Sequence, residues 1–200
     1  MTENEYFLCL SRLSHDLNNC LSITRSSMQM VEMENPSLTN DAMWQFSKDG
    51  IDDMVNILER FSHYRYGNKL SMSVVSFEKL FGDISSKISK TISPDCTDFE
   101  GDETKLKEAF LHIIENALEN GSDIIKLNAD YTQGHHIVTI SDNGSIAPEN
   151  IKDSLFEPFV TSKEAHHGLG LAIAKRIIEA HGGSIEYVRE NDWNCFRVIL

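Results

Sequence analysis

The chain has few residues of several kinds, and each shortage excludes a class of protein. Its 200 residues include only four cysteines, and none of them forms a Cys-x-x-Cys pair, so free thiols are expected rather than a metal site or disulfide framework. No apolar run approaches the ~20 residues that span a bilayer. The acidic N-terminus does not resemble a signal peptide. We therefore expect a cytoplasmic protein with no membrane segment.

Basic residues are also scarce. Eighteen lysines and arginines stand against 31 aspartates and glutamates, and the formal net charge is −13. Such a surface repels phosphate backbones, so we expect no nucleic-acid partner. Hydrophobic residues make up 40% of the chain, which is enough to form packed cores in one domain or two small ones.

Two amphipathic helices are expected in the N-terminal third. The first runs from about Asn4 to Glu32, and a proline-containing turn separates it from a second that begins near Thr39 or Asn40. Both carry apolar seven-residue repeats, formed by Phe7, Leu10, Leu17, Leu21, Met28 and Val31 in the first helix and by Trp44, Ile51, Met54, Leu58 and Phe61 in the second. Two such hairpins can pair as a four-helix bundle, so we expect a homodimer. The alternative, in which the hairpin folds back on its own chain, stays open.

His15 lies off this apolar repeat and is predicted to face water. Asp16 is its neighbour, and Asn19 follows one helical turn later on the same face. A solvated imidazole can be a nucleophile, a general base, a metal ligand or a surface residue without a role. The histidine and its neighbours alone leave these alternatives open.

The composition changes at Tyr64–Leu70, which predicts a boundary between domains 1–68 and 69–200. The second domain is expected to mix strands and helices. Strands are predicted at 71–75, near Lys90–Phe99, at 123–129 and 136–141 as a hairpin, and at 184–188 and 195–200 as a second hairpin. Helices are predicted over 77–88, from 101 to about 119, and from the Gly168-Leu-Gly170-Leu171 loop to about 181.

Two features of this domain could contribute to a binding site. His112, Asn116 and Asn120 recur every four residues on one face of a predicted helix, beside its apolar stripe. Gly168-Leu-Gly170-Leu171 feeds directly into a helix N-terminus, where backbone N–H groups and the helix dipole favour phosphate. Each feature also has a plainer explanation, as a solvated helix face and as turn glycines.

Five stretches of the chain, taken in order, resemble the conserved boxes of the sensor histidine kinases of two-component signalling. They are Leu13–Asn19 (H box), Leu111–Ala117 (N box), Asp142-Asn-Gly144 (first glycine box), Leu155–Phe159 (F box) and Gly168–Leu171 (second glycine box). The resemblance covers nearly the whole chain. It implies an α+β protein, in which an N-terminal helical hairpin forms a dimeric four-helix bundle. An α/β sandwich of the GHKL ATPase type follows, with a mixed sheet and helices on one face.

The resemblance also implies roles for individual residues. His15 would accept the γ-phosphoryl group of ATP, Asp16 would orient the imidazole and take up its proton, and Asn19 would assist dephosphorylation of the partner regulator. Asn116 would bind Mg²⁺, and Asp142 would accept the adenine amino group. The remaining residues expected to bind the nucleotide are His112, Asn120, Gly144, Phe156, Phe159, Lys163, Gly168 and Gly170.

The chain departs from the family at several of these positions. His112 replaces a common asparagine, as in chemotaxis kinases, and Glu119 and Asn120 replace the usual lysine and tyrosine. Glu119 puts a negative charge near the expected phosphates. We expect an ATP-dependent histidine kinase that phosphorylates His15 and passes the group to a response-regulator aspartate. The alternatives are a histidine phosphotransferase relay with a vestigial C-terminal domain and, less in keeping with the H box, a serine kinase of the anti-sigma type.

Overall fold

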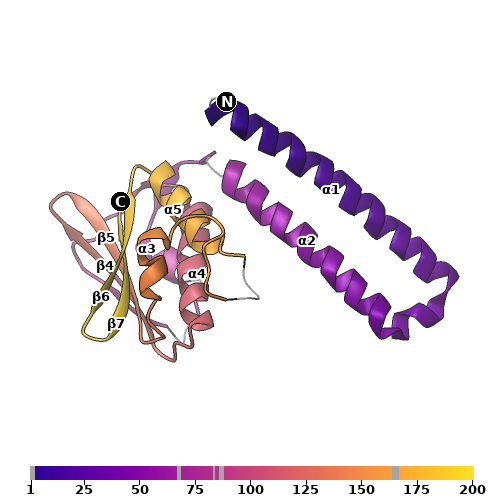
Figure 1. The fold of residues 1–200 in the computed structure, drawn as a ribbon. Helices are drawn as coiled ribbons and strands as arrows, with labels where there is room; N and C mark the ends of the chain where they lie inside the picture. The colour runs from indigo at the N-terminus through magenta and orange to yellow at the C-terminus, as the bar shows by residue number, and fades with distance from the viewer. Residues whose placement is uncertain (1–2, 67–68, 83, 86–87, 164–166) are drawn as a thin grey trace. The chain divides into compact units, whose positions relative to one another are not determined.

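The computed structural model describes residues 3–66, 69–82, 84–85, 88–163 and 167–200, apart from the side chains at 3–11, 63, 65 and 66. The chain divides into two compact units, Met1–His63 and Tyr64–Leu200 (Figure 1). This division lies a few residues before the boundary at 68/69 that the sequence suggested.

The N-terminal unit is a helical hairpin, as predicted. Helix α1 (Glu3–Glu34) and helix α2 (Ala42–Tyr66) are joined by the short 3₁₀ helix η1 (Pro36–Asn40). Pro36 lacks the N–H that would continue α1, and Asp41 Oδ1 accepts the N–H of Trp44 at 2.9 Å to cap α2. Across the described residues, neither these helices nor any other is both long and apolar enough to cross a membrane.

The apolar repeats are only partly covered within one hairpin. Leu17, Val31 and Met54 remain 42%, 40% and 46% exposed. Leu21, Met28, Ile51 and Leu58 are half-buried. The expected contributions of Phe7 and Leu10 lie outside the described side chains. The hairpin therefore retains apolar surface that a second copy can cover.

The C-terminal unit contains a five-stranded mixed sheet in the order β2-β4-β5-β7-β6. Its strands are β2 (Ser89–Ile92), β4 (Ile125–Thr132), β5 (His135–Asp142), β7 (Trp193–Ile199) and β6 (Ser184–Glu190). Strands β2 and β4 are parallel, and the other neighbours are antiparallel. Helices α4 (Glu103–Glu119) and α5 (Gly170–Ala180) lie on one face (Figure 1). This arrangement confirms the expected α+β fold.

The segment before α4 differs from the prediction. A single strand near Lys90–Phe99 was wrong, because the chain forms β2 and then β3 (Phe99–Gly101), which pairs antiparallel with β1 (Ser73–Val75) in a separate two-stranded sheet. Pro94 lies in the turn between them and has no N–H to donate to a ladder. Helix α3 (Phe77–Gly82) is also shorter than predicted, and residues 83 and 86–87 lie outside the description.

Asp102 begins α4 and ties it to neighbouring segments. Its carboxylate accepts the N–H groups of Lys105 at 3.0 Å and Ser71 at 2.7 Å, and its own N–H donates to Nε2 of His181 at 2.9 Å. Since Nε2 accepts, Nδ1 of the neutral ring carries the proton and donates it to the Ile177 carbonyl at 2.7 Å. Burial alone would raise the pKa of Asp102, but the two backbone donors and the charge of Lys105 hold this pKa below its ordinary value.

His136 on β5 is buried at 7% exposure among three aromatic rings. Its ring centroid lies 5.3 Å from that of Phe77, 5.0 Å from that of Phe99 and 4.8 Å from that of Tyr131. Nδ1 has no hydrogen-bond partner in the described part of the chain. Burial disfavours the charged imidazolium and lowers the pKa of His136.

Candidate functional site

His15 occupies an exposed position on α1, as the sequence predicted. Its side chain is 74% exposed, and its Nδ1 lies 3.3 Å from Asp16 Oδ1 and 3.3 Å from Asn19 Nδ2. Nδ1 can donate to the carboxylate when protonated or accept from the amide when not, but it cannot do both. In the first state Nε2 carries the free lone pair and is the nucleophilic nitrogen.

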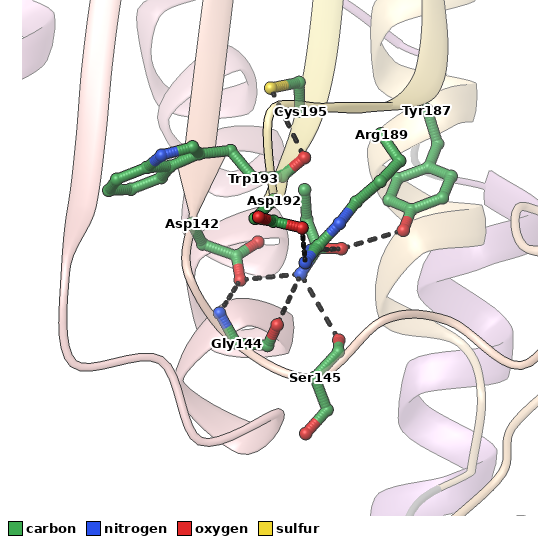
Figure 2. Close-up of polar contacts among 9 residues, drawn as sticks. Asp142, Gly144, Ser145, Tyr187, Arg189, Asp192, Trp193 and Cys195 are labelled. Atoms are coloured by element: carbon green, nitrogen blue, oxygen red, sulfur yellow. Dashed lines mark hydrogen bonds and ion pairs between the residues drawn. The ribbon is translucent and has the colours of Figure 1, made fainter.

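Asp142 lies at the end of β5 and is almost fully buried, at 1% exposure. Three donors converge on its Oδ1: the Ser122 hydroxyl at 2.6 Å, the Gly144 N–H at 2.8 Å and the Asn194 amide at 3.0 Å. Figure 2 shows the contacts with Gly144 and Asn194. A buried carboxylate is costly without such partners. All three bonds end on one oxygen, so Oδ2 is the atom available to an outside donor.

Gly144 brings the first glycine box against the end of α4. A Cβ at this position would lie 2.4 Å from Ser122 Oγ and 3.0 Å from the Asn120 carbonyl, so any side chain here would displace the Ser122 hydroxyl from Asp142. The Ser145 N–H donates to the same Asn120 carbonyl at 3.0 Å. Asn120 is the C-cap of α4 and not a member of its helical face, so its carbonyl, rather than its amide, makes this contact.

The polar side chains His112 and Asn116 of α4 lie on the side of the helix where His112 meets the start of α5. His112 and Asn116 are both half-buried, and a Cβ on Gly170 would lie 3.6 Å from His112 Nδ1. His112 Nδ1 is held 3.2 Å from Glu115. The Asn116 amide has no hydrogen-bond partner among the described residues, so its oxygen is available to a ligand.

Between the 3₁₀ helix η2 (Glu149–Ser154) and α5, a backbone hydrogen bond joins Phe159 to Gly168. The Phe159 N–H donates to the Gly168 carbonyl at 3.0 Å. Gly168 has φ +63°, and a Cβ there would lie 2.5 Å from the Val160 carbonyl. Phe156 packs edge-on against Phe196 with ring centroids 6.3 Å apart, while Phe159 is 55% exposed.

Lys163 is the cation of this loop. Its Nζ lies 3.2 Å from Oε2 of Glu119 at the end of α4, and the two side chains are 23% and 37% exposed. The loop is therefore linked to α4 by an ion pair formed with the residue that departs from the family pattern. Residues 164–166 lie outside the description.

Magnesium fits the residues present as an ion shared with a phosphate ligand. The described part of the chain holds no group of three or more His, Cys, Asp or Glu side chains that could bind a metal by itself. Asn116 offers a single neutral amide oxygen. Mg²⁺ suits such a site because it prefers oxygen ligands and usually keeps several waters and substrate phosphates in its shell.

Sequence reasoning missed four residues around Asp142: Ser122, Tyr187, Arg189 and Asn194. One signal was present, since Asn194 shares a strand face with Phe196 and Val198 and is the polar member of that buried set. The contacts themselves depend on the register of β5, β6 and β7, which pairs Asn194 with both Asp142 and Arg189. This register cannot be obtained from strand patterns alone.

Comparison with protein families gives one model that matches residues 101–200, described as histidine kinase-, DNA gyrase B- and HSP90-like ATPase. Among curated relatives, the sensory histidine kinase/phosphatase NtrB of Azospirillum brasilense is 27% identical over 95% of this chain and 54% of its own length. The C4-dicarboxylate transport sensor protein DctB of Rhizobium meliloti is 30% identical over 75% of this chain and 26% of its own length. The chain thus spans about half the length of the NtrB relative.

Solved structures share the fold. Full-length ShkA in complex with AMPPNP matches 95% of this chain and 44% of its own, with a TM-score of 0.75 and 21% identity. The catalytic domain of the histidine kinase ThkA matches 65% of this chain and 95% of its own, with a TM-score of 0.57 and 24% identity.

Proposed function

The chain belongs to the family of histidine kinase-, DNA gyrase B- and HSP90-like ATPases and is homologous to NtrB and other sensor histidine kinases, and from this we propose that it is an ATP-dependent protein histidine kinase. In this proposal, His15 receives the γ-phosphoryl group of ATP and passes it to an aspartate of a response regulator. We also propose that residues 1–68 form the dimerisation and phospho-acceptor domain and residues 69–200 the ATP-binding domain.

One observation carries the proposal: a buried carboxylate whose Oδ1 is saturated by three donors and whose Oδ2 is left to accept. Asp142 is that carboxylate. The 6-amino group of adenine is a donor that such an oxygen recognises through a charge-assisted hydrogen bond. Gly144 lies against Asn120 at the end of α4 and Gly170 against His112 of the same helix, and the ShkA structure, which shares this fold, contains AMPPNP.

The triphosphate is proposed to extend from this base site along α4 toward the start of α5. Asn116 would hold the metal through its amide oxygen, with His112 and Asn120 beside it. Mg²⁺, when bound, neutralises charge on the phosphate oxygens. Gly168 and Gly170 allow the backbone to approach the phosphates, and α5 presents its N-terminal N–H groups to them. Lys163 would add a positive charge near the phosphates. Phe156 and Phe159 would link the position of their own segment to that of the residues packed around it.

The chemistry at His15 follows from its neighbours. With the Nδ1 proton held by Asp16 at 3.3 Å, the Nε2 lone pair attacks the γ-phosphorus. The N–P bond forms as the bond from the γ-phosphorus to the bridging oxygen breaks, and ADP leaves with that electron pair. Asp16 stabilises the ring charge that develops and can take up the Nδ1 proton.

Asn19 is proposed to act in the reverse direction, on the phosphorylated regulator. Its amide lies one turn from the histidine and already contacts the Nδ1 atom at 3.3 Å. From this position, an amide can orient a water for in-line attack on a docked aspartyl phosphate. The NtrB relatives are described as kinase/phosphatases, which supports this part of the proposal. The protein is also proposed to be a homodimer, in which the partly exposed apolar repeats of two hairpins pack together.

The test is incubation with γ-labelled ATP and Mg²⁺. Wild type is expected to incorporate label that is lost in acid and kept in base, which is the behaviour of phosphohistidine. His15→Gln should abolish the label, and a matched control at an exposed histidine of β5, His135→Gln, should retain it. An unlabelled wild type would favour the relay alternative, and acid-stable label would favour a serine kinase.

A further inference from the structure

Three adjacent strands place one polar residue each in a single row. The register pairs Asp142 of β5 with Asn194 of β7, and Asn194 in turn with Arg189 of β6. Asn194 is buried at 3% exposure, whereas the row ends at the surface in Asp192, which is 4.0 Å from Arg189 and fully exposed. A buried carboxylate is therefore connected across the sheet to its surface turn.

The orientation of the Asn194 amide is determined by its partners (Figure 2). Its Oδ1 accepts from the Tyr187 hydroxyl at 2.8 Å and from the Arg189 guanidinium at 2.9 Å. A guanidinium can only donate, so the oxygen must face it and the NH₂ group must face the opposite way. That NH₂ group donates to Asp142 Oδ1 at 3.0 Å and to the carbonyls of Gly144 and Ser145, each at 3.2 Å.

These bonds fix two things at once. The first is the carboxylate plane of Asp142, because Oδ1 is held on the protein side by Asn194 together with Ser122 and Gly144. The second is the backbone of residues 144–145, which Asn194 holds through both carbonyls. Because the carboxylate plane is fixed, Oδ2 points in one direction and can accept a hydrogen bond from a ligand without any rotation of the side chain.

We propose that Asn194 is a positioning residue that sets the selectivity of the base site for a 6-aminopurine over a 6-oxopurine nucleotide. The inference rests on the proposed ATP site. A 6-amino group donates to a fixed acceptor, whereas a 6-oxo group turns a second acceptor toward Oδ2, and the neighbouring N1–H of a 6-oxopurine can reach Oδ2 only if the carboxylate or the base shifts. If the Asp142 carboxylate could turn, or the backbone of residues 144–145 could shift, the site would discriminate less against a 6-oxopurine.

The experiment compares binding of ATP and inosine triphosphate by calorimetry with Mg²⁺ present; the second carries a 6-oxo group and an N1–H in place of the 6-amino group and bare N1 of the first. The measured quantity is the ratio of the two dissociation constants. Asn194→Leu is expected to weaken ATP binding about tenfold and to lower the selectivity ratio at least fivefold, because a hydrogen bond to a charged group contributes about a tenfold factor or more. Arg189→Met, at a partly exposed position, should lower the ratio by about two- to threefold, because it removes one of two anchors of the amide.

Two comparisons separate positioning from general damage. Asn143→Leu is the matched control, since the Asn143 side chain holds the neighbouring loop through the N–H groups of Asp123 and Ile124 and does not contact Asp142. It should lower the melting temperature without changing the ratio. In the Asn194→Leu background, Arg189→Met should have no further effect on the ratio.

The outcomes distinguish the positioning role of Asn194 from the adenine contact of Asp142. A wild type that selects ATP, with Arg189→Met and any folded Asn194→Leu protein selecting it equally well, would overturn the positioning role alone. A wild type that binds both nucleotides equally, or neither, would overturn the adenine contact of Asp142 and this inference with it. A reduced ratio in Asn143→Leu equal to that in Asn194→Leu would also overturn it.

Discussion

Replacing Glu119 by glutamine is expected to tighten ATP binding. Its carboxylate lies 3.2 Å from Lys163 Nζ, and both groups belong to the region proposed for the phosphates. The ammonium must give up this ion pair before it can turn to a phosphate oxygen. Glu119→Gln removes that competition and also removes a negative charge that repels the ligand.

The magnitude follows from the ion pair. Two unit charges 3.2 Å apart attract by about 1.3 kcal/mol at the dielectric constant of water. Measured pairs on protein surfaces contribute ~0.2–1 kcal/mol after side-chain entropy is included. With the two side chains 23% and 37% exposed, we take the upper end of that range. Since ~1.4 kcal/mol corresponds to tenfold in affinity, the dissociation constant of ATP should fall about two- to fivefold.

The assay is calorimetric titration with Mg-ATP at two salt concentrations. At about 0.5 M salt the gain should shrink, because screening weakens interactions between exposed charges. Glu186→Gln is the control, since it removes the same charge from a pair with Arg197 at 2.8 Å on β6 and β7. A Glu119→Gln dissociation constant that is unchanged or higher would refute the reasoning, as would an equal gain in Glu186→Gln.

Three further predictions concern stability and assembly. Asp102→Asn should lower the free energy of unfolding by about 1 kcal/mol at pH 7. Because the folded-state pKa of Asp102 is lowered, its carboxylate stabilises the fold above the ordinary pKa of 3.8, and this stability is lost as pH falls through the folded-state pKa. The free energy from urea unfolding should therefore fall less steeply with decreasing pH in the variant than in wild type, and an equal slope would contradict this. Wild type should lose stability as pH falls from the ordinary histidine pKa of 6.5 through the lowered folded-state pKa of His136, because the unfolded chain takes up this proton first. His136→Phe should lack this loss, and equal declines in the free energy of unfolding between pH 7.5 and 5 in both proteins would count against it. Ile51→Asp should dissociate the proposed dimer by placing an unpaired carboxylate in the bundle, and sedimentation that shows the same mass as wild type would argue against this interface.

The sequence predicted best what depends on local periodicity and turn chemistry. The hairpin of α1 and α2 follows from the seven-residue repeats and Pro36, and the 133–134 turn between β4 and β5 follows from Gln133-Gly134 with Gly134 at φ +86°. His15 is exposed at 74% because it lies off the repeat. These features need only neighbours in sequence.

What the sequence could not predict depends on residues far apart in the chain. The division of the region near Pro94 into two strands of different sheets requires knowledge of which strand each one pairs with. Likewise, Asn194 contacts Asp142 across 52 residues only because β5 and β7 pair in one register. The motif showed that Asp142 was a candidate, but tertiary pairing decided which groups hold it.

The bond between Asp102 and His181 has a consequence for how α5 can open. His181 follows the last turn of α5 and is hydrogen-bonded at both ring nitrogens, one to the start of α4 and the other to the helix itself. The near end of α5 is held as well, because Leu169 and Leu171 are 1% and 8% exposed and the Gly168 carbonyl accepts the Phe159 N–H at 3.0 Å. With both ends fixed to the core, α5 is expected to open only together with α4 and the sheet that it covers, so its amide protons should exchange with solvent as slowly as those of α4.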